Sequence, residues 1–103
     1  MKVIFSKEAE VDLSALLQFL SNQTYPDRAE DFVDAIIDYC YDLGDFPYRG
    51  QSRDDLLPGL RILGFRRSAV ITIVVEETIV RIMGVYYGGI DLDTKLDELK
   101  NPE

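Results

Sequence analysis

The chain has 103 residues, one cysteine and no histidine, and its formal net charge is −8. This length suits one hydrophobic core, so we expect residues 1–103 to form a single domain. One cysteine excludes an internal disulfide, and without histidine the usual zinc and haem ligand sets are missing, so we expect no metal and no cofactor. No segment approaches the ~20 apolar residues of a membrane span, which predicts a cytoplasmic protein without membrane association.

The acidic charge is unevenly distributed along the chain. Residues 1–60 hold five Lys/Arg against twelve Asp/Glu, whereas residues 61–90 hold four Arg against two Glu. A strong excess of acid disfavours a protein whose main task is to grip phosphate backbones, so we expect no direct DNA binding. An arginine patch on a negative molecule favours a selective contact with a protein or a nucleotide.

The first half of the chain predicts a strand and two helices. Residues 2–5 are rich in β-formers, and Ser6 can cap a helix whose leucines recur at three-and-four spacing. After a break at residues 22–26, Asp27 can cap a second helix that stops near Gly44. This short connection makes the helices antiparallel neighbours, a hairpin that needs another apolar surface. The expected core positions are Ala9, Leu13, Leu16, Leu17, Leu20, Ala29, Phe32, Val33, Ile36, Cys40 and Leu43.

The second half supplies that surface as three strand-like runs, at residues 60–65, 69–75 and 79–85. The breakers between the runs predict an antiparallel meander. The middle run barely alternates, which is typical of a central strand covered on both faces. We therefore expect an α+β fold of order β-α-α-β-β-β, with the helical hairpin packed on an antiparallel sheet. Residues 91–99 could add a short C-terminal helix.

The sheet region contains the residues most able to contact a target. Arg81 and Tyr87 are six residues apart, so strict alternation along a strand would place them on one face. Such a pair could bind a phosphate or a carboxylate of a partner. In the alternative interpretation, Arg81 is a solvated strand residue and Tyr87 packs at the rim. The target-binding candidates are Arg61, Arg66, Arg67, Arg81, Tyr86 and Tyr87, of which Arg66 and Arg67 also suit a plain turn.

This order of signals resembles the RelE/ParE family of bacterial toxins from type II toxin-antitoxin systems, and within it the ParE branch. The residues that carry the resemblance are Phe46, Pro47 and Gly50 after the second helix, Pro58 to Arg61 before the sheet, and Gly88 with Asp91. The resemblance implies a RelE/ParE-like fold and a toxin that forms a hetero-oligomer with a cognate antitoxin. It also implies inhibition of an essential protein by binding, with DNA gyrase the leading candidate.

Some positions depart from the pattern of ParE-like chains. Tyr87 stands where such chains commonly have histidine, and Ile90 stands where they commonly have arginine. Val74 and Gly84 occupy strand positions that are often arginine. This chain therefore carries fewer basic groups along its sheet than the family pattern has.

RelE-like relatives suggest an alternative function, a ribosome-dependent mRNA endoribonuclease. That reaction needs a proton acceptor, a proton donor and cations for the charge on phosphorus. The available residues are Arg61 and Arg81, which would bind the phosphate, and Tyr86 or Tyr87, which would act as the general acid. No histidine or sheet lysine can serve as base, and an unperturbed tyrosine of pKa ~10 is a poor one. We therefore favour a non-catalytic inhibitor, and an interaction module that is stable only in its heterocomplex is a third interpretation.

Antitoxins of such systems fold onto the toxin as they bind, and the first helix offers a candidate surface. Val11, Ala15 and Phe19 recur at four-residue spacing on roughly the face opposite the leucines. A helix that is apolar on two sides is usually covered on two sides. We expect the antitoxin to cover these three residues, although the C-terminal segment of the chain or a dimer mate could do so instead.

Overall fold

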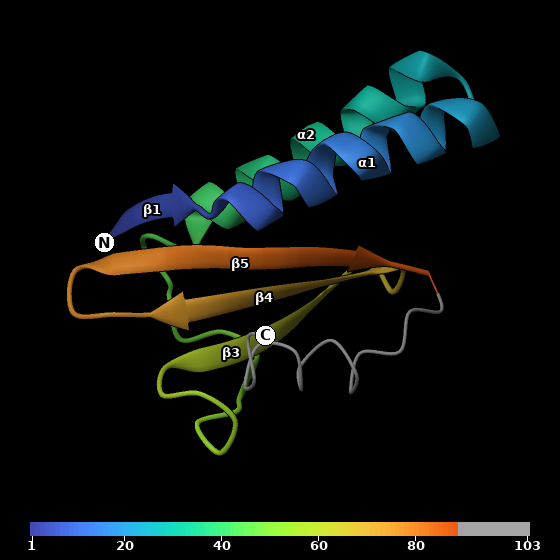
Figure 1. The fold of residues 1–103 in the computed structure, drawn as a ribbon. Helices are drawn as coiled ribbons and strands as arrows, with labels where there is room; N and C mark the ends of the chain where they lie inside the picture. The colour runs from blue at the N-terminus through green and yellow to red at the C-terminus, as the bar shows by residue number, and fades with distance from the viewer. Residues whose placement is uncertain (89–103) are drawn as a thin grey trace.

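The computed structural model describes residues 1–88, and the α1 and α2 helices lie side by side across one face of a sheet (Figure 1). The elements are β1 (Lys2–Phe5), α1 (Lys7–Gln23), α2 (Pro26–Asp42), β2 (Gln51–Ser52), β3 (Leu60–Phe65), β4 (Ala69–Val75) and β5 (Ile79–Tyr87). The α+β class and the predicted element order are confirmed, with β2 as an addition. The helix expected at residues 91–99 lies outside the described residues.

The two helices begin in different ways. Ser6 caps α1 as predicted, because its Oγ accepts a hydrogen bond from the Ala9 N–H at 3.0 Å. The cap predicted for α2 is wrong, because Tyr25 is the N-cap residue and Pro26 opens the helix. Proline suits the first helical position, since its φ is already helical and an N–H there would lack a partner. Asp27 instead places its charge in the first turn.

The sheet is mixed, with strand order β1-β5-β4-β3-β2. The predicted antiparallel meander of β3, β4 and β5 is confirmed. The prediction of a wholly antiparallel sheet is wrong at one edge, because β1 pairs with β5 in parallel, from Lys2 opposite Ile79 to Phe5 opposite Ile82. Side-chain periodicity reports which faces of a strand are buried and carries no information about the direction of its neighbour.

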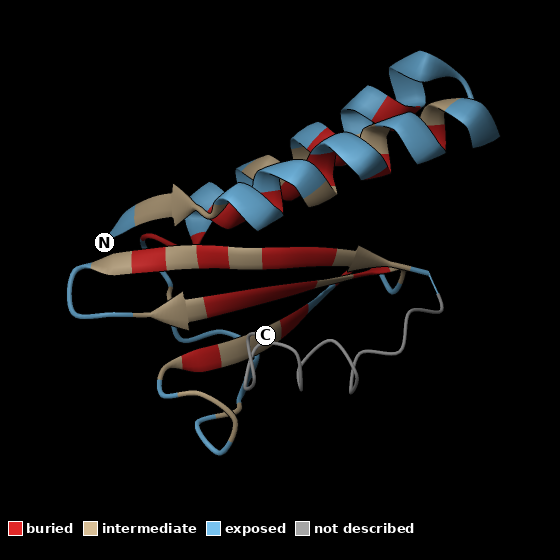
Figure 2. Ribbon diagram, in the orientation of Figure 1, coloured by how far each residue is buried: buried red, intermediate tan, exposed pale blue. Residues whose placement is uncertain are grey.

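The hydrophobic core lies between the helical hairpin and the sheet, where the buried positions of the helices face the strands (Figure 2). Its largest fully buried side chains include Ile36, Leu63, Ile71 and Ile82. Cys40 is part of this core, and burial raises the pKa of its thiol to about 12. The cysteine is therefore a small core residue that stays protonated at neutral pH.

Two negative results concern the described residues alone. Neither helix within residues 1–88 has the length and apolar character needed to cross a bilayer. The same part of the chain contains no cluster of three or more His, Cys, Asp or Glu side chains placed to hold a metal ion.

Candidate functional site

A bulge in β5 separates two candidate residues. The β4–β5 register places Thr72 opposite Gly84 but the next residue of β4 opposite Ile82, so Met83 is an extra residue in β5. This shift reverses the alternation beyond the bulge. The prediction that Arg81 and Tyr87 share a face is therefore wrong, because Tyr87 packs on the helix side and Arg81 lies on the other side.

The face of the sheet away from the helices, the outer face, gathers several positions from the sequence prediction. Arg81 is paired with Val74 across the strands, and Tyr86 lies beyond the bulge on the same face. The Arg81 guanidinium forms an ion pair with Glu76 at 3.3 Å. A Cβ at Gly84 would lie 2.6 Å from the Tyr86 hydroxyl oxygen, so the phenol folds back over this glycine. Arg81 and Tyr86 are thus half-buried on the outer face, which they share with β-branched residues that include the fully buried Thr72.

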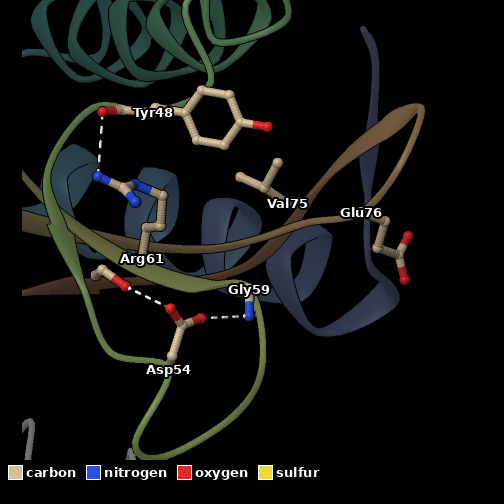
Figure 3. Close-up of a pocket in the computed structure, with 7 residues that line it drawn as sticks. Tyr48, Asp54, Gly59, Arg61, Val75 and Glu76 are labelled. Carbon is tan, nitrogen blue, oxygen red and sulfur yellow. Dashed lines mark hydrogen bonds between the residues drawn. The ribbon is translucent and has the colours of Figure 1, made fainter.

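Arg61 holds the loop that follows α2. Its Nε donates to the Arg49 carbonyl at 2.8 Å, and its Nη2 donates to the Gly50 carbonyl at 3.2 Å. The Nη2 also donates to the Tyr48 carbonyl at 3.1 Å (Figure 3). The guanidinium also lies over the Tyr48 ring, 5.8 Å from its centroid. Much of the hydrogen-bonding capacity of Arg61 is therefore used within the fold.

A shallow polar pocket lies beside this loop, and its charged groups are also engaged. Asp54 accepts hydrogen bonds from the Gly59 N–H at 2.8 Å and from the Ser52 hydroxyl at 3.0 Å (Figure 3). The Gly59 bond, then the Ser52 bond, lowers the pKa of the Asp54 carboxyl. The carboxylate closes the turn that leads into β3, and Arg61 holds the other wall. The pocket is therefore formed by the way these loops pack against each other.

Arg66 and Arg67 form the turn between β3 and β4, as the alternative interpretation predicted. Both have positive φ, 49° and 60°, which bends the chain tightly between the two strands. The Arg66 guanidinium lies over two rings, 5.1 Å from the centroid of Phe65 and 5.9 Å from that of Phe32. Arg66 is thus held in a defined place at the end of the sheet.

Aromatic side chains connect this turn to both helices. We call the set Phe19, Tyr87, Phe32, Phe65 and Tyr39 the aromatic row. Neighbouring rings in the row have centroids 5.4–6.0 Å apart. The sequence analysis missed Tyr39 as part of a surface feature, because its partner rings come from β3 and no local spacing links them.

The predicted antitoxin surface is exposed on α1. Val11 is 59% exposed and Phe19 is 50% exposed, while Ala15 is also exposed. The Phe19 ring lies 6.0 Å from the Tyr87 ring, so this surface reaches the end of β5. Within residues 1–88, no other part of the chain buries these three side chains.

Asp12 joins α1 to the free edge of β5, a contact that the sequence analysis missed. Its Oδ2 accepts a hydrogen bond from the Val85 N–H at 3.1 Å. The parallel partner β1 has ended by this point, so Asp12 satisfies a backbone donor that would otherwise face outward. The sequence shows only that Asp12 is a carboxylate on one side of α1. That does not distinguish a residue that binds the β5 backbone from one that is exposed to solvent.

The structure does not bring together the four residues considered for RNA cleavage, Arg61, Arg81, Tyr86 and Tyr87. Arg61 points to the helix side of the sheet, since Leu63 two residues later is in the helix-side core. Arg81 lies on the outer face. Tyr86 and Tyr87 are likewise on opposite faces, so the two arginines and two tyrosines considered for this reaction do not gather on one face of the sheet.

Comparisons with known proteins agree with this architecture. A family model described as the ParE toxin of type II toxin-antitoxin system, parDE, matches residues 3–92. A solved chain described as "Chromosomal ParDE TA system from P. aeruginosa" has a TM-score of 0.73 and 21% identity, and the match covers 85% of this chain and 96% of that chain. A search of curated proteins gave no match. Because the family model spans most of its length, the chain belongs to the ParE toxin family of type II toxin-antitoxin systems.

Proposed function

We propose that this ParE toxin acts by binding an essential cellular protein, with DNA gyrase the leading candidate, and makes or breaks no covalent bond itself. Membership of the family implies a cognate antitoxin as its partner. The observation that supports a non-catalytic mode of action is the separation of the two arginines and two tyrosines across the sheet. Phosphoryl transfer to the RNA 2′-hydroxyl would need these groups, or others like them, around one phosphorus atom.

The outer face is the proposed target-binding surface. Arg81 and Tyr86 are both partly buried and lie among residues such as Val70 and Val74. Arginine and tyrosine surrounded by apolar side chains are the residue types that dominate protein interfaces. A carboxylate of the target can take the place of Glu76 on the Arg81 guanidinium.

A DNA supercoiling assay and a translating ribosome extract test this proposal together. Purified chain should inhibit supercoiling by gyrase and leave mRNA intact. The double variant Arg81→Ala, Tyr86→Phe should raise the inhibitory concentration at least about tenfold, since contacts of this kind carry much of an interface's energy. Arg28→Ala, on the exposed side of α2, is the matched control and should inhibit as the natural chain does. Cleavage of mRNA near the ribosomal A site would instead support the endoribonuclease.

The antitoxin is proposed to cover α1, in a hetero-oligomer that also shields the end of β5. Val11 and Ala15 provide exposed apolar contacts, and Phe19 extends them to Tyr87. An antitoxin seated here would lie against the end of β5 from the helix side, while Tyr86 of the same strand lies on the outer face.

Val11→Asp should weaken binding of the cognate antitoxin at least about tenfold, because a charge would then enter an apolar contact. The thermal midpoint of the free toxin should stay close to its natural value, since Val11 is 59% exposed. Calorimetric titration with purified antitoxin measures the change. Asp34→Ala on α2 is the control, and equal losses in the two variants would contradict an antitoxin surface on α1.

A further inference from the structure

Among the described residues, the edge of β3 has no strand partner at Gly64. Strand β2 pairs Gln51 with Ile62 and then ends, although a continued antiparallel register would bring Arg49 opposite Gly64. Gly50, with φ +76°, turns the chain off the strand at this point. The hydrogen bonds from Arg61 fix the position of the turned segment.

The backbone groups of Gly64 point toward this open side. Along β3, the Gly59 carbonyl accepts from the Val75 N–H of the β4 side at 2.9 Å, and the Leu60 carbonyl accepts from the Arg53 N–H of the β2 side at 2.8 Å. Because the directions alternate, the N–H and C=O of Gly64 face the β2 side. Gly64 is exposed, and no atom within 4 Å would meet a Cβ built on it. A strand edge that no residue of 1–88 pairs with or covers can accept another strand.

Two arginines stand at the ends of this open edge. Arg49 lies over Phe46 at 5.1 Å and over Tyr39 at 5.8 Å, and Arg66 lies over Phe65 and Phe32. Tyr39 and Phe65 are in contact, with ring centroids 5.4 Å apart, so the aromatic row joins the two arginines. Within residues 1–88, neither Arg49 nor Arg66 forms an ion pair. Both guanidinium groups are therefore oriented by rings, and no carboxylate of the described residues neutralises them.

We propose that the open edge of β3 binds an extended, acidic segment of a protein partner, which pairs with the Gly64 backbone and sets carboxylates on Arg49 and Arg66. Strand addition supplies main-chain hydrogen bonds, and the side chains that flank the edge supply selectivity. Arginines that aromatic rings already hold lose little freedom when a carboxylate arrives. This inference concerns a different surface from the outer face and does not depend on the identity of the toxin's target.

The geometry also defines the segment that fits. A strand rises about 3.3 Å per residue, and residues that face the same side are an even number apart. Two carboxylates four positions apart, about 13 Å, lie on one side of the added strand, and the proposal assigns one of them to Arg49 and the other to Arg66. Asp31 and Asp38 are exposed beside Phe32 and Tyr39, so a dense polyanion such as nucleic acid would meet repulsion that two isolated carboxylates avoid.

The test uses the full-length chain and synthetic peptides. The probe is a seven-residue peptide of threonine and valine with glutamates at its second and sixth positions. The comparison peptides have lysines at those positions, or have the second glutamate moved to the fifth position. The first peptide should bind at least about tenfold more tightly than either comparison peptide, and it should slow hydrogen exchange at the Gly64 amide.

Two variants distinguish strand addition from simple charge attraction. Gly64→Pro removes the outward N–H, whereas Gly64→Ala keeps it and adds a methyl group in open space. Gly64→Pro should weaken binding of the glutamate peptide about tenfold, and Gly64→Ala should bind this peptide as tightly as the natural chain does. Should Gly64→Pro fail to fold, the double variant Arg49→Ala, Arg66→Ala should lose the preference for glutamate over lysine.

Three results would overturn the proposal. The first is equal binding of the glutamate and lysine peptides. The second is unchanged exchange at the Gly64 amide in a saturated complex. The third is tighter binding of a single-stranded oligonucleotide of eight nucleotides, lost in the arginine double variant, which would identify the edge as a nucleic-acid site. None of these results bears on inhibition of supercoiling, so the two proposals can fail separately.

Discussion

Replacement of Gly50 by alanine should lower the free energy of unfolding by about 3 kcal/mol, from the strain of positive φ and from overpacking. Gly50 has φ +76°, a conformation that L side chains rarely adopt. An added Cβ would press on the Ile62 carbonyl oxygen and lie 2.8 Å from the Leu63 Cγ, so neither backbone nor side chain leaves room. Urea unfolding followed by circular dichroism measures the change.

Gly64→Ala is the matched control for this substitution. Gly64 is not one of the described glycines with positive φ, and a Cβ built on it would meet no atom within 4 Å. The free energy of unfolding of the Gly64→Ala variant should stay the same or rise by up to about 0.5–1 kcal/mol, because alanine loses less backbone freedom than glycine on folding. Equal destabilisation by both substitutions would contradict the view that the turn at Gly50 requires glycine.

Phe65→Ala should destabilise the fold by about 3–4 kcal/mol, in the range observed for loss of a buried phenyl ring. Phe65 is 8% exposed and contacts the rings of Phe32 and Tyr39. It also carries the Arg66 guanidinium, 5.1 Å from its centroid. Phe65→Leu keeps most of the apolar volume, so it should keep more than half of the stability that Phe65→Ala loses.

A double-mutant cycle with Arg66→Ala separates packing from the cation–π contact. Arg66 is exposed, so its contact with two rings should give a coupling energy of about 0.5–1 kcal/mol. A coupling near zero would show that Arg66 rests on the rings without stabilising them. The cycle therefore also measures how firmly one end of the β3 edge is held.

The core of the fold could be predicted because its signals are local and repeated. The spacing of leucines identified the buried face of α1, and Ala29, Val33, Ile36 and Cys40 identified that of α2. The runs of Val and Ile between breakers identified β3, β4 and β5. Each of these patterns reports how a single segment meets the core, and hydrophobic burial decides that without reference to distant partners.

The arrangement of the candidate site could not be predicted in the same way. One extra residue, Met83, reverses the faces of Arg81 and Tyr87, and the only local signal for the bulge is the neighbouring Gly84, which does not fix the strand register. The two-residue strand β2 is too short to show alternation. The role of Arg61 depends on carbonyl groups contributed by another segment, so its side chain alone did not distinguish a loop contact from a target contact.

The parallel pairing of β1 with β5 has a consequence for how the protein is made. Lys2 and Phe5 find their strand partners at Ile79 and Ile82, near the other end of the described chain. During synthesis, the first strand must wait unpaired until β5 has emerged, after the helical hairpin and the other strands of the sheet. The edge of the sheet that β1 forms therefore closes late, and the speed of folding should depend on how soon β5 becomes available to it.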